Sequence, residues 1–503
     1  MMNRDSVRYV RRIFVTLCIG IVLTLVGRSS AEPIDLTLKS AVEIAMRNSY
    51  RIKRLELGIE RTRLYLKARQ AQLKSFVSMN LKAPEFEAIS DYKWNSTLQR
   101  DEIVRQNTRL WEMGFSISQP MILLGHPTNG YLSLNTKTYR YRQEEGDVNY
   151  YNRLFVKFTQ PFFQPNFLKN NIEDAELDLQ REDLDFIADQ VRLIEDVADD
   201  YYDLFELAYQ ISIHSRHVEQ LERAQEVAER VPDPARAMEA IQVQVELGNA
   251  REQLYQGQGR YRIEMDQLKQ RLGMETDVEL HLNPAIVLDS VTVDDERAVE
   301  SGLMLRPRLQ REYIQRRKEE VDLDNTRGRN SFRLDLEVTY GLERQDEFVR
   351  ELWGDYNSSY SLSLNAYIPI WDWGRRKALL EADMIGVRRS GLLIKEVENQ
   401  IISEISSTVR NLREFQQRAL RMADNLQKAK LITERSITQY ENDVVSLLDL
   451  LRSISTERET ELRFADTYLG YRRAILRLML QSYYDFENNV LLFDRFGVRR
   501  EES

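Results

Sequence analysis

The sequence predicts a mainly α-helical protein with a small β part, built from two copies of a helix–strand–strand–helix unit. Of its 503 residues 30% are charged, while only 20 glycines and 11 prolines are present to interrupt helices. A weak internal repeat indicates the duplication, because Ala41-Val42-Glu43 opens one predicted helix and Ala298-Val299-Glu300 opens another 257 residues later. The same order of predicted elements follows both openings, although few residues are identical.

The chain divides into five segments on this basis. Residues 1–31 are predicted to be a signal peptide, 32–273 the first repeat, 274–293 a linker, 294–484 the second repeat and 485–503 a loose, charged tail. The signal peptide combines a basic start, an apolar core and the small residues Ser29-Ser30-Ala31, after which cleavage is expected. An uncleaved anchor is the alternative. Cys18, the only cysteine, lies in this segment, so no disulfide is expected in the mature chain.

Two very long helices give the strongest signal. Residues 166–230 contain neither glycine nor proline, and a helix of that length spans roughly 95 Å. Residues 392–440 also contain neither glycine nor proline. In both regions the apolar residues recur in alternating steps of three and four, the pattern of a coiled-coil seam. The seam positions are Ile187, Val191, Ile194, Ala198, Tyr201, Phe205 and Ala208 in the first half and Ile402, Ile405, Val409, Leu412, Ala419, Ala423 and Leu426 in the second.

Four strands are predicted, near 75–83, 151–160, 331–341 and 359–369, and the second pair alternates strictly between apolar and polar residues. One face of that pair carries Leu334, Leu336, Val338, Leu362 and Leu364, and the other carries Arg333, Asp335, Glu337, Ser361, Ser363 and Asn365. This alternation suits a soluble sheet over a core, or a membrane barrel with lipid on its apolar face and water in its lumen. Export favours the barrel, as do the aromatic residues that end the strands, Phe162, Phe163, Trp371 and Trp373.

The long connection 84–150 is predicted to be an exposed insertion that carries an extra hairpin, because Phe115–Ser118 and Tyr131–Asn135 also alternate. Apart from this insertion, one chain supplies four strands. Four strands cannot close a barrel without unpaired edges, which lipid does not tolerate. Several chains must therefore pool their strands, and three chains would supply twelve.

Three motifs, taken in order, resemble the TolC family of outer-membrane efflux and secretion ducts. The first runs from Leu36 to Ala45 and continues as Arg47-Asn48, the second runs from Phe158 to Phe163, and the third runs from Tyr367 to Arg376. The closing helices of each half add to the likeness, which covers almost the whole mature chain.

The resemblance implies a homotrimer with a twelve-stranded β-barrel in the outer membrane and an α-helical tunnel across the periplasm. It implies passive exit for substrates that an inner-membrane RND or ABC transporter delivers through a periplasmic adaptor, in efflux or type I secretion. The periplasmic tip would lie at the helix turns near 230–236 and 440–450. There Asp449 and Asp443 are candidates for a constricting ring of carboxylates, and ordinary exposed acids are the alternative. No glycine follows Tyr440, unlike the usual family turn.

Other kinds of site are not indicated. The net charge of −9 argues against a nucleic-acid partner. No catalytic set, phosphate-binding loop or cysteine cluster stands out, so we expect no enzyme, cofactor or metal site. His214 and His217, three residues apart, are predicted to lie on a solvated helix face, with a metal pair as the alternative. The alternative function is a soluble periplasmic coiled-coil scaffold or adaptor, which needs the long helices but no lipid-facing strands.

Overall fold

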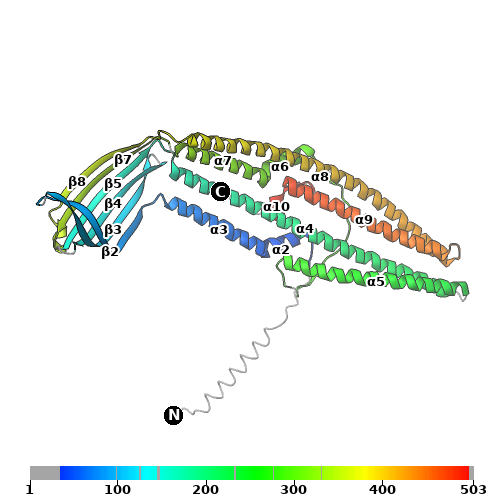
Figure 1. The fold of residues 1–503 in the computed structure, drawn as a ribbon. Coiled ribbons are helices and arrows are strands. Elements are labelled where there is room, and N and C mark those ends of the chain that lie inside the picture. The colour runs from blue at the N-terminus through cyan, green and yellow to red at the C-terminus, as the bar shows by residue number, and fades with distance from the viewer. Residues whose placement is uncertain are drawn as a thin grey trace, which may run out of the picture.

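A computed structural model describes residues 34–97, 99–123, 126–143, 148–230, 234–275, 277–329 and 331–497. The molecule is elongated, with one β-sheet at one end and long helices that run from it to the other end (Figure 1). The predicted signal peptide, residues 1–31, lies outside the described residues. Within the described ranges, none of the helices combines the length and the apolar character that a membrane span requires.

Each repeat contributes four helices in the same order. They are α2 (Leu38–Asn48), α3 (Tyr50–Ala71), α4 (Phe167–Arg230) and α5 (Pro234–Arg271) in the first repeat, and α6 (Asp295–Leu305), α7 (Pro307–Gly328), α8 (Arg375–Glu441) and α9 (Leu447–Ser482) in the second. The opening helix of both repeats is broken after its first 11 residues, and the second part has 22 residues. Ser49 caps α3, and Pro307 occupies the first turn of α7, where its missing N–H costs nothing. The break between the first two helices is therefore present in both repeats.

The predicted seams of α4 and α8 form the core of the helical body. Ile194 and Ala198 on α4, and Ile405 and Val409 on α8, have no exposed surface. The first seam packs with α2, α5 and α9, and the second packs with α6 and α9. Ile402 is an exception, since it is 39% exposed while the adjacent Ile401 is buried.

The sheet contains six antiparallel strands in sequential order. They are β2 (Phe76–Asn95), β3 (Arg100–Leu123), β4 (His126–Gln143), β5 (Val148–Phe162), β7 (Arg333–Asp346) and β8 (Asn357–Tyr367). The mainly helical class with a smaller β part is confirmed. The strand number differs from the expected four, because β3 and β4, the hairpin within 84–150, pair with β2 and β5 and so belong to the main sheet.

Residues 484–496 fold into regular elements, which corrects the expectation of a loose tail for this stretch. After α9 the chain forms a short antiparallel pair, β9 (Tyr484–Asp485) with β10 (Val490–Leu491), and the helix α10 (Leu492–Phe496). The side chains of Leu492, Phe493 and Phe496 are buried in the core around α2 and α4. The burial of these apolar side chains therefore keeps the segment against the helical body, although many of its other residues are charged. Near the linker, β1 (Ile34–Asp35) pairs with β6 (Leu280–His281) in parallel.

Candidate channel-forming surfaces

The two faces of the sheet differ in chemistry across all six strands. Residues that pair across neighbouring antiparallel strands lie on the same face. One row of such pairs, on the apolar face, crosses the sheet as Val77, Ile117, Leu134, Val156, Tyr340 and Tyr360. The adjacent row, on the polar face, begins with Phe76 at the start of β2 and continues as Ser118, Ser133, Lys157, Thr339 and Ser361. In these two rows the hairpin of β3 and β4 continues both faces, whereas further along β4 Thr136 and Thr138 occupy positions on the apolar face.

The residues singled out on β7 and β8 divide between these faces as their alternation predicts. Leu336 pairs with Leu364 and Val338 with Leu362, and Leu334 lies on the same apolar face. Asp335 pairs with Asn365 and Glu337 with Ser363 on the polar face, where Arg333 and Ser361 also lie. The register of β7 and β8 thus places the apolar set side by side on one face and the polar set side by side on the other. Which face meets lipid stays a prediction.

Ion pairs between neighbouring strands neutralise the polar face. Lys157 Nζ lies 2.8 Å from Glu337 Oε1, and Lys137 Nζ lies 3.2 Å from Glu112 Oε1. Arg153 Nε lies 3.1 Å from Glu343 Oε1, which also accepts from the Ser359 hydroxyl. These charges are half-buried and paired, so the face offers a water-compatible lining.

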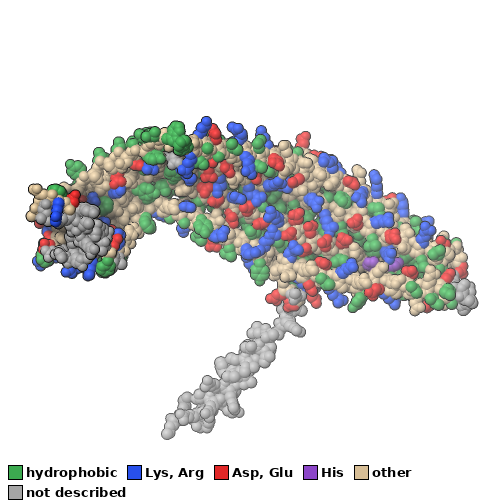
Figure 2. Space-filling model, in the orientation of Figure 1, with side chains coloured by type: hydrophobic (Ala, Val, Ile, Leu, Met, Phe, Trp, Pro, Cys, Tyr) green, Lys and Arg blue, Asp and Glu red, His purple; other side chains and the backbone are tan. Residues whose placement is uncertain are grey.

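The apolar face has no cover over its middle. Val156 and Leu134, in the centre of the sheet, are both 42% exposed, whereas core residues of the helical body are almost fully buried. In Figure 2 hydrophobic side chains gather over the sheet and its junction with the helices, while acidic and basic side chains alternate over the helical body. An exposed apolar area of this extent indicates a lipid or protein partner.

Aromatic side chains mark the junction between strands and helices. Phe162 pairs with Leu334 at the end of the sheet, and Phe163 packs on Phe332 with ring centroids 5.4 Å apart. Trp371 and Trp373 form an edge-on pair in the segment between β8 and α8, and are 74% and 88% exposed. All four predicted aromatics therefore lie near one level of the molecule. A belt of this kind is typical of a membrane–water interface, and that role stays a prediction.

At the far end of the helices, Asp443 replaces the expected glycine in the turn after α8. Its φ of +59° is left-handed, and its N–H donates to the Tyr440 carbonyl while the Val444 N–H donates to the Gln439 carbonyl. These two bonds are the Schellman arrangement that usually takes glycine or asparagine at this place. The turn therefore keeps its geometry without glycine, and Asp443 has a structural role there.

Asp449 lies in the first turn of α9, and its carboxylate contacts Ser446, the residue that caps this helix. The Ser446 hydroxyl donates to the Asp449 carboxylate at 2.7 Å, and the Asp449 N–H donates to Ser446 Oγ at 3.2 Å. A helix N-terminus also favours the negative charge. The side chain remains exposed and lines an open groove together with Arg452. The contact with the capping Ser446 and the position at a helix N-terminus thus account for an acid here, and a ring of three carboxylates stays a prediction.

The tips of the two repeats are joined. The Tyr440 hydroxyl, at the end of α8, donates to Glu239 Oε2 on α5 at 2.9 Å, and its ring is only 2% exposed. Around it Val227, Val243 and Leu450 form a small core. Pro232-Asp233 of the first tip lies outside the described residues. The contact between α5 and α8 holds the two helix pairs together at this end.

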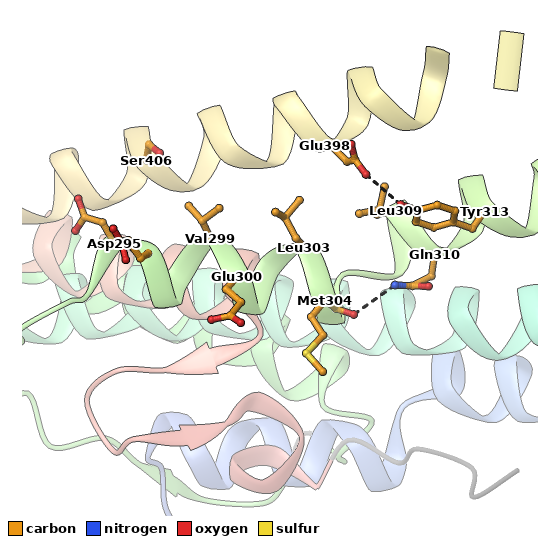
Figure 3. A pocket seen from close by; sticks show the side chains of 11 residues that line it. Asp295, Val299, Glu300, Leu303, Met304, Leu309, Gln310, Tyr313, Glu398 and Ser406 are labelled. Carbon is orange, nitrogen blue, oxygen red and sulfur yellow. Dashed lines mark hydrogen bonds between the residues drawn. The ribbon is translucent and has the colours of Figure 1, made fainter. Parts of the chain in front are cut away.

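An open groove lies between the break of α6 and α7 and the long helix α8 (Figure 3). Val299, Leu303 and Leu309 line it, its rim is acidic, and its volume is about 800 Å³. The first repeat has an equivalent groove, lined by Glu43, Met46 and other residues of α2 to α4, but there α10 supplies one wall. Among the described residues, the C-terminal segment contributes to the wall of the first groove and not to that of the second.

His214 and His217 are packed between helices, which corrects the prediction of a solvated face. His217 is 8% exposed, and the Nδ1 atoms of both rings are buried. Burial, then Arg458 on α9, then His214 lower the pKa of His217 to about 4, and burial with Arg458 lowers the pKa of His214. Glu457 and Glu461 of α9 face the same stretch of α4. Among the described residues no group of three or more potential ligands could hold a metal ion.

His217 is expected to make the helical body less stable in acid. Because its pKa is about 4 in the folded chain and about 6.5 when unfolded, only the unfolded chain takes up the proton between these values. Stability is therefore lost as the pH falls from about 6.5 towards 4. His217→Gln should reduce this loss, measured as the thermal midpoint of helical circular dichroism at several pH values. The exposed His281→Gln is the control, and equal slopes for His217→Gln and the wild type would contradict the assignment.

Solved structures of membrane channels share this architecture. The outer-membrane channel OprN matches with a TM-score of 0.66 at 12% identity, covering 88% of this chain and 89% of its own. VceC of Vibrio cholerae matches with a TM-score of 0.63 at 12% identity, over 88% of this chain and 95% of its own. MtrE of Neisseria gonorrhoeae matches with a TM-score of 0.62 at 11% identity, over 88% of both chains.

These neighbours are channel proteins rather than enzymes. No family model and no curated protein matches the chain in sequence. The likeness is therefore one of fold, and it confirms the resemblance drawn from the three sequence motifs at that level. The chain has the fold of the TolC-family outer-membrane channels.

Proposed function

We propose that this protein is the subunit of a homotrimeric outer-membrane channel whose helices extend into the periplasm. It provides passive exit for substrates that an inner-membrane transporter, of the RND or ABC type, delivers through a periplasmic adaptor. Efflux and type I secretion are both compatible with this role. The likeness in fold to the outer-membrane channels OprN and MtrE and to the outer-membrane protein VceC supports the proposal, as does the predicted signal peptide.

The observation that carries the proposal is the sheet with two unlike faces at the end of the helical body. The polar face carries ion pairs between its own strands, and among the described residues the apolar side chains in the middle of the other face, such as Leu134 and Val156, are left exposed. A soluble scaffold would bury such a face, because several exposed apolar strands in water promote aggregation. In a membrane β-barrel the apolar face would contact lipid on the outside and the polar face would contact water in the lumen, so both faces would have suitable surroundings.

Fractionation of cells that express the full chain tests the proposal. We expect an oligomer in the outer-membrane fraction whose migration changes on heating, and ion conductance when it is reconstituted in planar bilayers. Recovery as a soluble monomer in the periplasm would instead support the scaffold and refute the channel.

Asp449→Asn tests the acidic ring at the tip. The amide oxygen of asparagine still accepts from the Ser446 hydroxyl, so the cap of α9 is retained while three charges are lost from a trimer. If Asp449 faces the tunnel, cation selectivity in bilayer recordings should fall with little change in stability. Unchanged selectivity would leave Asp449 only as a partner of the capping residue Ser446. Glu459→Gln, an exposed acid further along α9, is the matched control.

A further inference from the structure

The hairpin of β3 and β4 changes the number of strands that each chain brings to the membrane. Its strands lie in the interior of the sheet: β3 pairs with β2 from Phe76↔Ser118 to Lys82↔Glu112, and β4 pairs with β5 from Tyr131↔Thr159 to Arg142↔Val148. The TolC resemblance implies four strands per chain, and this chain has six. Since β2 and β5 are separated by the hairpin, they do not pair with each other.

The hairpin has the same two faces as the rest of the sheet. Met113, Phe115 and Leu134 lie on the apolar face, whereas Glu112 and Lys137 form their ion pair on the polar face. A hairpin that projected into water would have no reason to carry an uncovered apolar face aligned with that of four other strands. The hairpin's alternation of apolar and polar residues therefore fits the same surroundings as that of β5 and β7, with lipid on one face and water on the other.

The two outer strands of the sheet, β2 and β8, each have one unpaired edge within the described chain. Their apolar side chains are the more exposed ones: Met79 is 59% and Leu362 is 73% exposed, against 37% for Val338 inside the sheet. With six alternating strands, β2 and β8 run in opposite directions, so β8 of one copy can continue the antiparallel order by pairing with β2 of a second copy. Pairing satisfies backbone groups that lipid would leave unsatisfied.

We propose that three copies of this chain close an eighteen-stranded barrel, through β8-to-β2 pairing between copies, with a wide polar lumen for bulky hydrophilic cargo. This inference rests on the proposed trimeric channel. Barrel diameter grows roughly linearly with strand number, so eighteen strands give a barrel about one and a half times as wide as twelve. Barrels of about 16–18 strands leave an aqueous channel. The ion pairs Lys137–Glu112, Arg153–Glu343 and Lys157–Glu337 join neighbouring strands along the polar face, so these charges are paired within the wall of the proposed lumen.

Cysteine cross-linking of the full chain tests the strand order, since the only native cysteine, Cys18, lies in the predicted signal peptide. Ser361→Cys on β8 is combined in turn with Ser78→Cys, Asn80→Cys and Lys82→Cys on β2. All four positions lie on the polar face. We expect oxidation to give covalent dimers and trimers for at least one pair, with no larger species. A ladder that stops at two copies would mean twelve strands from two chains and would overturn the proposal.

A second cysteine pair distinguishes a hairpin inside the barrel from one outside it. Ser78 and Phe155 lie on one row of the sheet but three strand spacings apart, about 14 Å. A disulfide needs Cα atoms within about 7 Å. The pair Ser78→Cys with Phe155→Cys should therefore stay reduced. Efficient cross-linking would show β2 beside β5, as in a twelve-stranded barrel, and would refute the inference.

The width of the lumen is measured with neutral polymers of graded size, added on the outer side during bilayer recordings. In the comparison variant, Asn-Gly replaces residues 87–147, so that Phe86 meets Val148; these two residues lie on one row of the sheet. We expect the wild type to admit polymers about one and a half times larger in radius than the variant admits. Equal cut-offs would overturn the wide lumen.

These outcomes separate the two proposals. If the full chain forms no outer-membrane oligomer and no pore, the proposed function fails. If it forms a conducting trimer in which β2 lies beside β5, the function stands and the eighteen-stranded barrel fails. The cross-links are read on full-length chains, so the strand order is decided even if the shortened variant does not assemble.

Discussion

Val156→Arg is expected to abolish most of the outer-membrane oligomer. Val156 lies in the centre of the apolar face, on the row that joins Leu134 to Tyr340, and 42% of its surface is exposed. If lipid covers this face, an arginine near the middle of the bilayer costs about 2–4 kcal/mol per chain. The measurement is the amount of heat-modifiable oligomer in the outer-membrane fraction, compared with the wild type at equal expression.

Thr159→Arg is the matched control, three residues along the same strand. Thr159 lies on the polar face and pairs across the sheet with Glu337, so an added guanidinium meets an acidic partner there. We expect near-normal assembly for this variant. Similar losses for Val156→Arg and Thr159→Arg would mean that the two faces do not meet different solvents, and the channel proposal would fail.

The double variant Arg216→Ala with Lys430→Ala should destabilise the helical body by about 3–5 kcal/mol, because it leaves a buried carboxylate without a counter-charge. Glu461, on α9, is 2% exposed and pairs with Arg216 of α4 and with Lys430 of α8. The Tyr209 hydroxyl, which donates to it at 3.2 Å, would be its main remaining partner. The free energy of unfolding, followed by helical circular dichroism in denaturant, measures the effect.

Adding Glu461→Gln to this double variant should recover more than half of the lost stability, since a neutral amide needs no cation beside it. The exposed pair of Arg463 and Glu459 supplies the control: Arg463→Ala should cost no more than about 1 kcal/mol. A double variant that is as mild as Arg463→Ala would show that Glu461 reaches water when its partners are removed.

The helical part of the fold was predictable because its signals are local. Steps of three and four along α4 and α8 identify the seams, and the buried Ile194 and Ile405 confirm them. Glu461 was missed although a signal was present. On α9 the sequence Leu450, Ile454, Glu457, Glu461, Phe464 keeps the seam spacing, so two acids stand at core positions. Acids in a seam indicate cations on facing helices, but spacing on one helix does not say which cations these are.

The sheet was predicted in part, because alternation reports the faces of a strand but not its neighbours. The faces of β7 and β8 follow from their alternation, and the register bears this out. The hairpin in 84–150 was predicted, but its place between β2 and β5 depends on backbone pairing far along the chain. Likewise His217 is polar by composition, and only the packing of α9 against α4 shows that it is buried.

The inserted hairpin also bears on how such channels diversify. Two strands joined by a turn enter and leave the sheet in the same place, so every other strand keeps its direction, its facing and its attachment to a helix. One strand added alone would reverse all of these. A gene segment that encodes a hairpin can thus be gained or lost as a module, so that the width of the proposed barrel can change while the helical body stays the same.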